Sequence, residues 1–270
     1  MVKARKNAME QTMEKLNYES SGSLGIITLV DSPLNLIGLD LVKGLEEAVC
    51  WAESHPLRGL LLKADEGNFS AGADVNIFVG LNPDRAEEML SGFLKLINRI
   101  EDLPYPTMAA VRGMCLAGGL ELALGCDFIW AAENATFGQL ETSIGAIPFA
   151  GGAQRLAARA GTARAKGIVL GASVHSAAEF EKWGIVNRIL PETDLNSKAS
   201  KFMEKVAEAG PTVALGYCKA LINTFSRSGL EAADELNNKL SQRIFDTDDL
   251  QAGISSLLKN GPGKAVFRGR

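Results

Sequence analysis

The chain has 270 residues, of which 46% are hydrophobic and 22% are charged, a balance typical of a globular protein with a sizeable core. The formal net charge is -4 and the pI is about 5.4, so a broad basic surface for nucleic acid is not expected. No segment approaches the roughly 20 uninterrupted apolar residues of a membrane span, and the basic N-terminal segment lacks the apolar core of a signal peptide. We therefore expect a cytoplasmic protein with neither nucleic acid nor a membrane as partner.

Cysteine and histidine usage restricts the chemistry further. The four cysteines form no C-x-x-C pair and lie in apolar stretches, which predicts reduced thiols in the core; they are Cys50, Cys115, Cys126 and Cys218. Only two histidines occur. This scarcity argues against a histidine-rich metal site and against a Ser-His-Asp site, so no bound metal is expected.

The first elements alternate between strands and helices. Residues 1–17 are polar and are expected to form an extension, in part a frayed helix. The β-branched run Leu24–Val30 predicts a strand. Apolar residues at helical spacing over Leu39–His55, followed by Pro56, predict a helix. The apolar segment Leu57–Asp65 predicts a second buried strand.

The next helix has a clear beginning in the sequence. Asn82 is a good N-cap residue, and Pro83 suits the first helical position. Two more strands are expected at 106–111 and 127–132, with a helix that carries Glu121 between them. The repeated strand-turn-helix pattern indicates an α/β protein.

The last third of the chain reads as helical. A helix-turn-helix region and a short strand at 184–191 come first, and the periodicity then predicts four helices, at 198–209, 211–226, 231–246 and 248–258. We therefore divide the chain into a polar extension at 1–17, an α/β core at 18–195, and a C-terminal helical region at 196–270. The apolar faces of this last region are expected to pack either on a partner subunit or back on the core.

Two glycine-rich loops each follow a predicted strand. In "GNFSAGAD" (67–74), Ala73 offers a backbone N–H, and in "LAGGLE" (116–121), Gly118 lies at the start of a helix. The first N–H groups of a helix are free, and two convergent N–H groups form an oxyanion hole. The alternative is that each loop merely lets a helix and a strand pack closely.

Two glutamates accompany these loops. Glu121 lies one helical turn after Gly118, and Glu141 follows one strand later. Paired carboxyl groups beside an oxyanion hole suit proton removal next to a carbonyl, or activation of a water that attacks a conjugated acyl group. For Glu141, a solvated loop acid is the alternative.

Three stretches together resemble the enoyl-CoA hydratase/isomerase, or crotonase, superfamily, and most closely its enoyl-CoA hydratases. They are "GNFSAGADVNIF" (67–78), "AAVRGMCLAGGLELALGCDFIWAAENATFGQLE" (109–141) and "GAIPFAGGAQRL" (145–156). The resemblance runs from about residue 24 to 191. It implies a crotonase-like spiral of ββα units with a C-terminal helical trimerisation region, and a homotrimer or a hexamer made of two trimers.

The resemblance also implies the substrate and the site. The substrate would be an acyl-CoA thioester whose oxygen is bound by the N–H groups of Ala73 and Gly118. Glu121 would be the base for a water that adds to Cβ, and Glu141 would deliver the proton to Cα. No cofactor is implied, because CoA belongs to the substrate. The implied contacts with CoA and substrate come from Ala71, Asp74, Val75, Asn76, Phe149, Lys264 and Phe267, the last two across subunits.

The chain departs from the hydratases of the superfamily in two places. Leu140 stands where they usually carry proline before the second glutamate, and Phe149 stands where they usually carry glycine. Phe149 keeps other acyl-CoA reactions open, namely double-bond isomerisation, decarboxylation and thioester hydrolysis. A non-catalytic CoA- or RNA-binding relative is a further alternative, although acids at Glu204 and Glu208 interrupt the lysines of the helix at 198–209.

Overall fold

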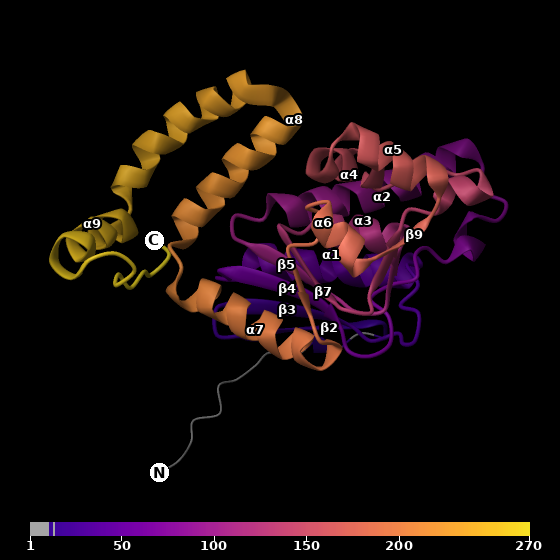
Figure 1. Ribbon diagram of the computed structural model, residues 1–270, viewed down its shortest axis with the longest axis horizontal. Coiled ribbons are helices and arrows are strands. Elements are labelled where there is room, and N and C mark those ends of the chain that lie inside the picture. The colour runs from indigo at the N-terminus through magenta and orange to yellow at the C-terminus, as the bar shows by residue number, and fades with distance from the viewer. Residues whose placement is uncertain (1–10, 13) are drawn as a thin grey trace, which may run out of the picture.

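The structure is a computed structural model that describes residues 11, 12 and 14–270. Its centre is a seven-stranded sheet in the order β1-β2-β3-β4-β5-β7-β10 (Figure 1). The antiparallel strands β1 and β2 form one edge, and the strands from β3 onward are parallel. The bounds are β1 Gln11–Thr12, β2 Leu16–Ser21, β3 Leu24–Leu29, β4 Gly59–Ala64, β5 Thr107–Val111, β7 Phe128–Ala132 and β10 Arg188–Leu190.

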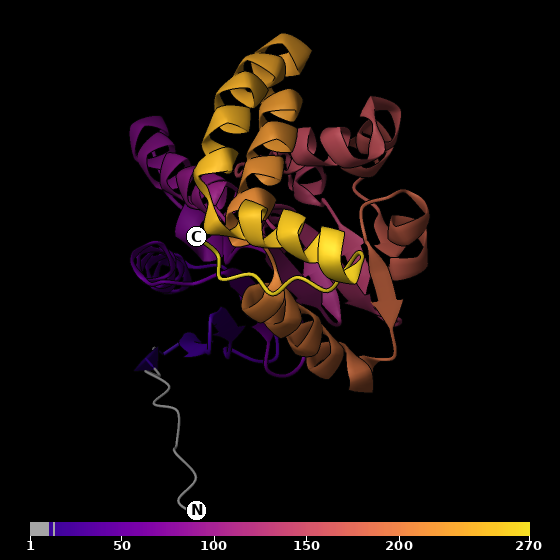
Figure 2. The same ribbon diagram turned by 90° about the vertical axis from the view of Figure 1, so that its left-hand side faces the viewer.

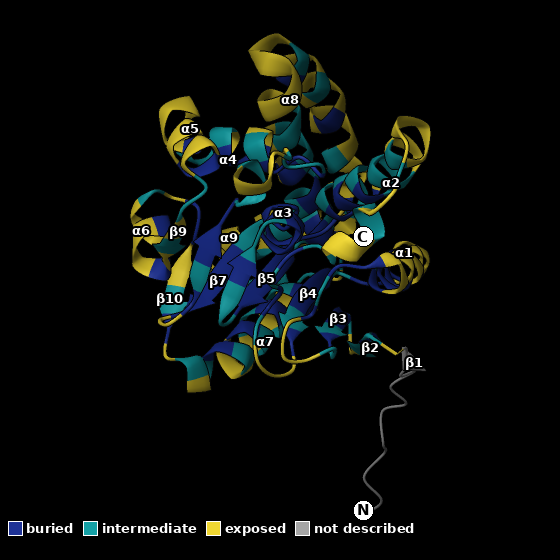
Figure 3. Ribbon diagram, turned by 90° about the vertical axis from the view of Figure 1, so that its right-hand side faces the viewer, coloured by how far each residue is buried: buried dark blue, intermediate teal, exposed yellow. Residues whose placement is uncertain are grey.

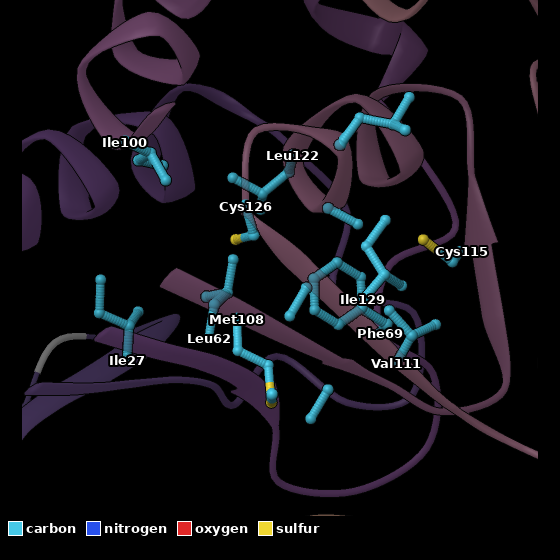
Figure 4. Close-up of a cluster of buried hydrophobic side chains, with 14 of the residues drawn as sticks. Ile27, Leu62, Phe69, Ile100, Met108, Val111, Cys115, Leu122, Cys126 and Ile129 are labelled. Carbon is cyan, nitrogen blue, oxygen red and sulfur yellow. The ribbon is translucent and has the colours of Figure 1, made fainter. Parts of the chain in front are cut away.

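Helices cover both faces of this sheet, which explains why its central strands are mostly apolar. Helix α7 (Glu192–Ala209) lies under one face, and the helices from α1 to α6 lie over the other (Figures 1 and 3). Figure 4 shows side chains from β3, β4, β5 and β7 meeting those of α2 and α3 in the core; among them are Ile27, Leu62, Met108 and Ile129, each at most 2% exposed.

The helices above the sheet confirm most of the expected elements. Their bounds are α1 Leu39–Ser54, η1 Val75–Phe78, α2 Pro83–Asp102, α3 Gly118–Leu124, η2 Glu141–Ile144, α4 Gly152–Ala160, α5 Thr162–Gly171 and α6 Ala177–Lys182. Asn82 caps α2 as expected, because its side chain accepts a hydrogen bond of 2.9 Å from the N–H of Arg85. Helix α3 ends at Leu124, with Gly125 as its C-cap.

A second, three-stranded sheet was not predicted from the sequence. Its order is β6-β8-β9, with β6 at Met114–Leu116, β8 at Thr136–Gly138 and β9 at Val174–Ser176. Each strand has three residues, too few for alternation of apolar and polar side chains to be recognised. Each of the units β5-β6-α3 and β7-β8-η2-α4 contributes one strand to either sheet, which is the ββα spiral that we expected.

The C-terminal region is helical, as expected. Helix α8 (Thr212–Arg243) bends at Gly229, whose φ of 83° is not helical, so its two halves correspond to two of the expected helices. The chain continues through η3 (Ile244–Asp246) into α9 (Asp248–Asn260). Figures 1 and 2 show the halves of α8 forming a hairpin that stands away from the sheet, with α9 near its base.

Three expectations need correction. The frayed helix expected within residues 1–17 is wrong for the described ones, because the side chains of Leu16 and Tyr18 are buried on one face of a strand; residues 1–10 and 13 lie outside the described residues. Cys50 and Cys218 are exposed rather than in the core. Helix α7 begins six residues earlier than expected, so the boundaries at 17/18 and 195/196 fall inside β2 and α7.

In the part of the chain that the structure describes, we find no helix with the length and apolar character needed to cross a membrane.

Helix α3 begins in close contact with the first glycine loop. A Cβ on Gly119 would lie 2.6 Å from the Cβ and 2.7 Å from the carbonyl oxygen of Ser70. A side chain therefore cannot fit at this position without moving the backbone of one loop away from the other.

We expect Gly119→Ala to lower the free energy of unfolding by about 1–3 kcal/mol, because the added methyl group overpacks this contact. The matched control is Gly92→Ala in α2, where a Cβ meets nothing within 4 Å. It should raise the stability by about 0.5–1 kcal/mol, because alanine is the better helix former. Urea unfolding of both variants measures the difference, and equal stabilities would contradict this account.

Candidate active site

Backbone pairing holds the two glycine loops side by side. Ser70 and Cys115 form a parallel bridge, in which the N–H of Ser70 donates to the carbonyl of Met114 and the N–H of Leu116 donates to that of Ser70, both at 3.0 Å. The Ser70 hydroxyl donates to the carbonyl of Asn35 at 2.8 Å. The loops are thus fixed to each other by hydrogen bonds beside the short sheet rather than by side-chain packing alone.

This pairing brings two backbone N–H groups together. The bridge between Ile37 and Ala73 uses the carbonyl of Gly72 and the N–H of Asp74, and no described residue accepts a hydrogen bond from the N–H of Ala73. Gly118 is the first residue of α3, so its N–H has no partner within the helix. A Cβ on Gly118 would lie 3.8 Å from the Ala73 nitrogen. The glycine therefore keeps open the space between the two nitrogens.

The residue before α3 has an unusual backbone conformation. Ala117 has φ 50° and ψ -123°, a combination that a residue with a Cβ rarely adopts. Its N–H donates to the carbonyl of Gly138 at 2.8 Å, which ties the turn to β8. Strained residues of this kind cluster at functional sites, where the surrounding structure holds them in place.

Glu121 is the buried acid of the site. It is 2% exposed, and its Oε1 accepts hydrogen bonds of 2.8 Å from the N–H groups of both Ala150 and Gly152. Burial raises the pKa of its carboxyl to about 7, and the nearby charge of Glu141 acts in the same direction, whereas the two N–H groups act against it. A carboxyl with a pKa near neutrality can both accept and release a proton under ordinary conditions.

Glu141, the first residue of η2, is the second acid of the site, and its charge acts on Glu121. Its Oε1 accepts a hydrogen bond of 2.8 Å from the side-chain amide of Gln139. Its Oε2 is buried and has no hydrogen-bond partner in the described part of the chain. Burial raises the pKa of this carboxyl as well. Glu141 is therefore not the solvated loop acid that was the alternative interpretation.

Together these groups suit proton transfer next to a bound oxygen atom. Two N–H groups without acceptors can stabilise negative charge, and two carboxyl groups of raised pKa can hold and exchange a proton. The unpartnered Oε2 of Glu141 is a position at which a water or a substrate atom would complete the hydrogen bonding.

Comparison with known proteins connects this site to a family. A sequence model described as enoyl-CoA hydratase/isomerase matches residues 19–267. The chain belongs to this family. A probable enoyl-CoA hydratase of Rhizobium meliloti (strain 1021) is 33% identical over 259 residues, which cover 95% of this chain and 99% of that protein. A short-chain-enoyl-CoA hydratase of Clostridium acetobutylicum is 30% identical over 247 residues, covering 89% and 93%.

Solved structures agree with the enoyl-CoA hydratase/isomerase fold. The crystal structure of an enoyl-CoA hydratase from Bacillus anthracis matches with a TM-score of 0.86 and 27% identity, covering 95% of this chain and all of that one. A structure from Geobacillus kaustophilus HTA426 has a TM-score of 0.91 at 24% identity and supports the fold alone. The protein is accordingly an enzyme of the hydratase/isomerase family that acts on acyl-CoA.

Phe149, one of the departures from the superfamily pattern, contributes to an aromatic pair. Its ring lies 5.8 Å from that of Phe78 at the end of η1, with the planes inclined at 56°. Phe149 also directly precedes Ala150, whose N–H binds Glu121. The pair thus joins the segment after the first glycine loop to the segment that holds the buried acid.

The first glycine loop shows how the expected CoA-contacting residues are arranged. Ala71 is half-buried, and its N–H donates to the carbonyl of Leu34. The carboxylate of Asp74 accepts hydrogen bonds from the backbone and the side chain of Asn76, at 3.1 and 2.7 Å. The side chains of Val75 and Asn76 are exposed. This segment therefore presents a fixed turn with free side chains next to the N–H of Ala73.

Lys264 and Phe267 are not brought to the glycine loops within one chain. Phe267 lies beside Gly253 of α9, with its ring 3.3 Å from the position of an added Cβ, and Lys264 is exposed. Figure 1 shows this end of the chain near the base of α8, on the other side of the molecule from α3.

A cavity of about 530 Å³ also lies away from the glycine loops. It is bounded by the ends of α1 and α2, by residues 103–105 and by α8, and Glu101 and Lys219 are among its lining residues. Both halves of α8 line it, with Lys219 on the inner half and Leu240 on the outer half, and Figure 1 shows these two halves side by side. Neither Glu121 nor Glu141 lines this cavity. We therefore place the candidate active site at the two acids and not at this cavity.

Residue-by-residue analysis of the sequence missed three partners of the two acids. Ala150 and Gly152 bind Glu121 through their backbone N–H groups, so no side-chain type identifies them. Gln139 was seen only as part of a motif, although it binds Glu141. The doublet Gly151–Gly152 was the available signal, because glycines before a helix often mark free N–H groups.

We expect the stability gain from Glu121→Gln to depend on pH. From the pKa of an unfolded glutamate, about 4.3, up to about 7, the folded protein holds a proton that the unfolded chain releases, so its free energy of unfolding falls as the pH rises. Glutamine avoids this loss and can still accept both N–H bonds. Between pH 5 and pH 8, the free energy of unfolding of the variant should therefore rise relative to that of the wild type by on the order of 1–3 kcal/mol.

Urea unfolding at pH 5, 6, 7 and 8 measures this gain. The control is Glu133→Gln, an exposed glutamate in the turn after β7, which should show no such trend. A stability difference between Glu121→Gln and the wild type that is constant with pH would contradict the raised pKa.

Proposed function

We propose that the chain hydrates a trans-2-enoyl-CoA to a 3-hydroxyacyl-CoA. The observation that carries the proposal is the arrangement of the buried Glu121 and the half-buried Glu141, two carboxyl groups of raised pKa, with the free N–H groups of Ala73 and Gly118. The curated relatives named enoyl-CoA hydratase support it at about 30% identity.

In the proposed reaction, the thioester oxygen binds the N–H groups of Ala73 and Gly118. Negative charge grows on this oxygen when water adds to Cβ, and preorganised N–H donors stabilise the charge without having to reorient. Glu121 in its ionised form takes the proton from the water as the new C–O bond forms. Glu141 in its protonated form gives a proton to Cα, so one water is added in total. CoA enters as part of the substrate, and the proposed chemistry uses no other cofactor.

The raised pKa values of both carboxyl groups support the roles of Glu121 as the base and Glu141 as the acid. At neutral pH a buried carboxyl with a pKa of about 7 is ionised in about half of the molecules, so Glu121 is available as a base. The Oε2 of Glu141 has no partner among the described residues, which leaves it free to act on a bound substrate. Neighbouring carboxyl groups that repel each other favour a state in which they share one proton.

A second candidate is another acyl-CoA reaction in the same site: double-bond isomerisation, decarboxylation or thioester hydrolysis. The observation that favours it is the ring of Phe149, which adjoins the segment holding Glu121 and packs against Phe78. A ring at this position narrows the space for the catalytic water. Leu140 in place of proline also leaves the backbone before Glu141 less restricted.

The decisive experiment follows the loss of enoyl-thioester absorbance with crotonyl-CoA. We expect rapid loss with the wild type and a 100- to 10,000-fold lower kcat in Glu121→Gln and in Glu141→Gln, because each variant lacks one proton transfer. Glu133→Gln, which changes an exposed glutamate in the same way, should match the wild type.

Phe149→Gly, measured in the same series, separates the two candidates. No hydration by the wild type but measurable hydration by Phe149→Gly would transfer the proposal to the second candidate. No hydration by either protein, while saturated acyl-CoA still binds, would reject the hydratase proposal altogether.

We further propose that the chain self-associates through its C-terminal helices, as a homotrimer or as a hexamer of two trimers. Large apolar side chains are exposed along α8 and α9, and burying them in an interface would remove them from water; they include Ile222, Phe225, Leu230, Leu257 and Leu258. Sedimentation velocity tests this directly. We expect a species of three or six chains of 28.7 kDa, and a monomer across the micromolar range would contradict it.

A further inference from the structure

One arginine connects the segment that binds Glu121 to the rest of the protein. The Nη1 of Arg155 donates to the carbonyls of Ala150 at 3.1 Å and Gly151 at 3.5 Å. The carbonyl of Gly151 and the N–H of Gly152 belong to one planar peptide group. The carbonyl of Gly151 also accepts a hydrogen bond of 3.2 Å from the backbone N–H of Arg155. The backbone and the side chain of Arg155 thus together hold the peptide group whose N–H donates to Glu121 at 2.8 Å.

Arg155 is itself buried and needs a partner for its charge. The residue is 8% exposed, and its Nη2 donates to the side chains of Asn98 and Glu101 on α2, both at 2.7 Å. A buried charge that lacks an ion-pair partner is strongly unfavourable. Glu101 thus fixes the position of the guanidinium group that holds the segment 150–152.

Glu101 also forms an ion pair with a residue of the C-terminal region. Its Oε2 also accepts a hydrogen bond of 2.6 Å from Arg227 of α8, which pairs with Asp102 as well, at 2.7 Å. Arg227 follows Lys219 and Asn223 at four-residue spacing, so the three side chains lie on one face of α8. Asn223 donates to the carbonyl of Glu101, and Lys219 forms an ion pair with Asp127. We call these three residues the polar row of α8.

We propose that Arg155 is a positioning residue for Glu121, and that Glu101 connects the polar row of α8 to the segment 150–152 through Arg155. The first half of α8 then contributes to the geometry of the active site although it contacts neither acid. The proposal rests on the proposed function only in giving Glu121 the part of a base. Its geometry is independent of the reaction.

The charged groups around Glu121 determine how its titration should change when Arg155 is replaced. After burial, which raises its pKa, the acting charges are Glu141 from η2, which raises it further, and Arg155 from α4, which lowers it. The N–H groups of Ala150 and Gly152 also lower it. Loss of the Arg155 side chain removes a positive charge and one of the two donors that hold the peptide group of Gly151 and Gly152. Both consequences move the titration of Glu121 to higher pH.

The test measures the titration of Glu121 in the free protein, without substrate. Carbon-13 NMR of protein labelled at the glutamate carboxyl carbons reports each titration, and the signal missing from Glu121→Gln assigns the residue. We expect the midpoint to move to higher pH in Arg155→Met, and to move less in Arg155→Lys, which keeps the charge but loses the fork of donors. Arg227→Ala should move it in the same direction by a smaller amount.

The matched control is Arg99→Ala. Arg99 lies two residues before Glu101 on α2 and forms a two-bond ion pair with Glu53, yet it contacts none of the groups around Glu121. Its removal should leave the midpoint unchanged. If the wild type hydrates crotonyl-CoA, kcat/KM at pH 6.5 should also fall about 10- to 100-fold in Arg155→Met, with partial recovery in Arg155→Lys.

The outcomes separate the possibilities. A folded Arg155→Met with the midpoint of the wild type overturns the positioning role, and Arg155→Lys decides it if Arg155→Met does not fold. A moved midpoint in the Arg155 variants with none in Arg227→Ala overturns the connection to α8. An inactive wild type whose midpoint responds as expected rejects the proposed reaction and leaves this inference standing.

Discussion

The structure depends on keeping the carboxyl group of Glu121 out of water. A carboxylate placed among apolar side chains is costly unless hydrogen bonds replace its solvent. Here two backbone N–H groups, from Ala150 and Gly152, provide those bonds. This arrangement requires α3 to start close to the first glycine loop. It also requires glycine at the start of α4, because a Cβ on Gly152 would lie 2.7 Å from the amide oxygen of Gln139. Several of the chain's glycines thus serve one buried acid.

The short sheet provides the rigidity that this arrangement requires. Its strands are too small to be stable alone, but the bridges at Ile37 and Ser70 continue its hydrogen bonding through both glycine loops. The segments that carry the N–H groups of Ala73 and Gly118 are thereby attached to one hydrogen-bonded surface. The larger sheet and its covering helices carry the hydrophobic core, so the two sheets divide stability and chemistry between them (Figures 3 and 4).

The sequence predicted the parts of the fold that depend on side-chain periodicity. The helix from Leu39 and the helix capped by Asn82 are amphipathic and well bounded, and both begin where expected. The short strands and the N–H donors to Glu121 could not be predicted in this way, because they depend on backbone hydrogen bonds between segments far apart in the chain. The spacing after Glu121 indicated Glu141, and the resemblance to the superfamily pointed to Phe149; only the structure describes the surroundings of both residues.

The bend at Gly229 lies two residues beyond Arg227, the last member of the polar row. The polar row therefore ends where the helix changes direction, and the outer half continues from a backbone conformation that glycine readily adopts. The contacts of the polar row with Glu101 and Asp127 restrict substitution in the inner half, whereas the outer half carries none of them. Substitutions in the outer half can therefore change the surface that it presents while Arg155 and the segment 150–152 keep their contacts.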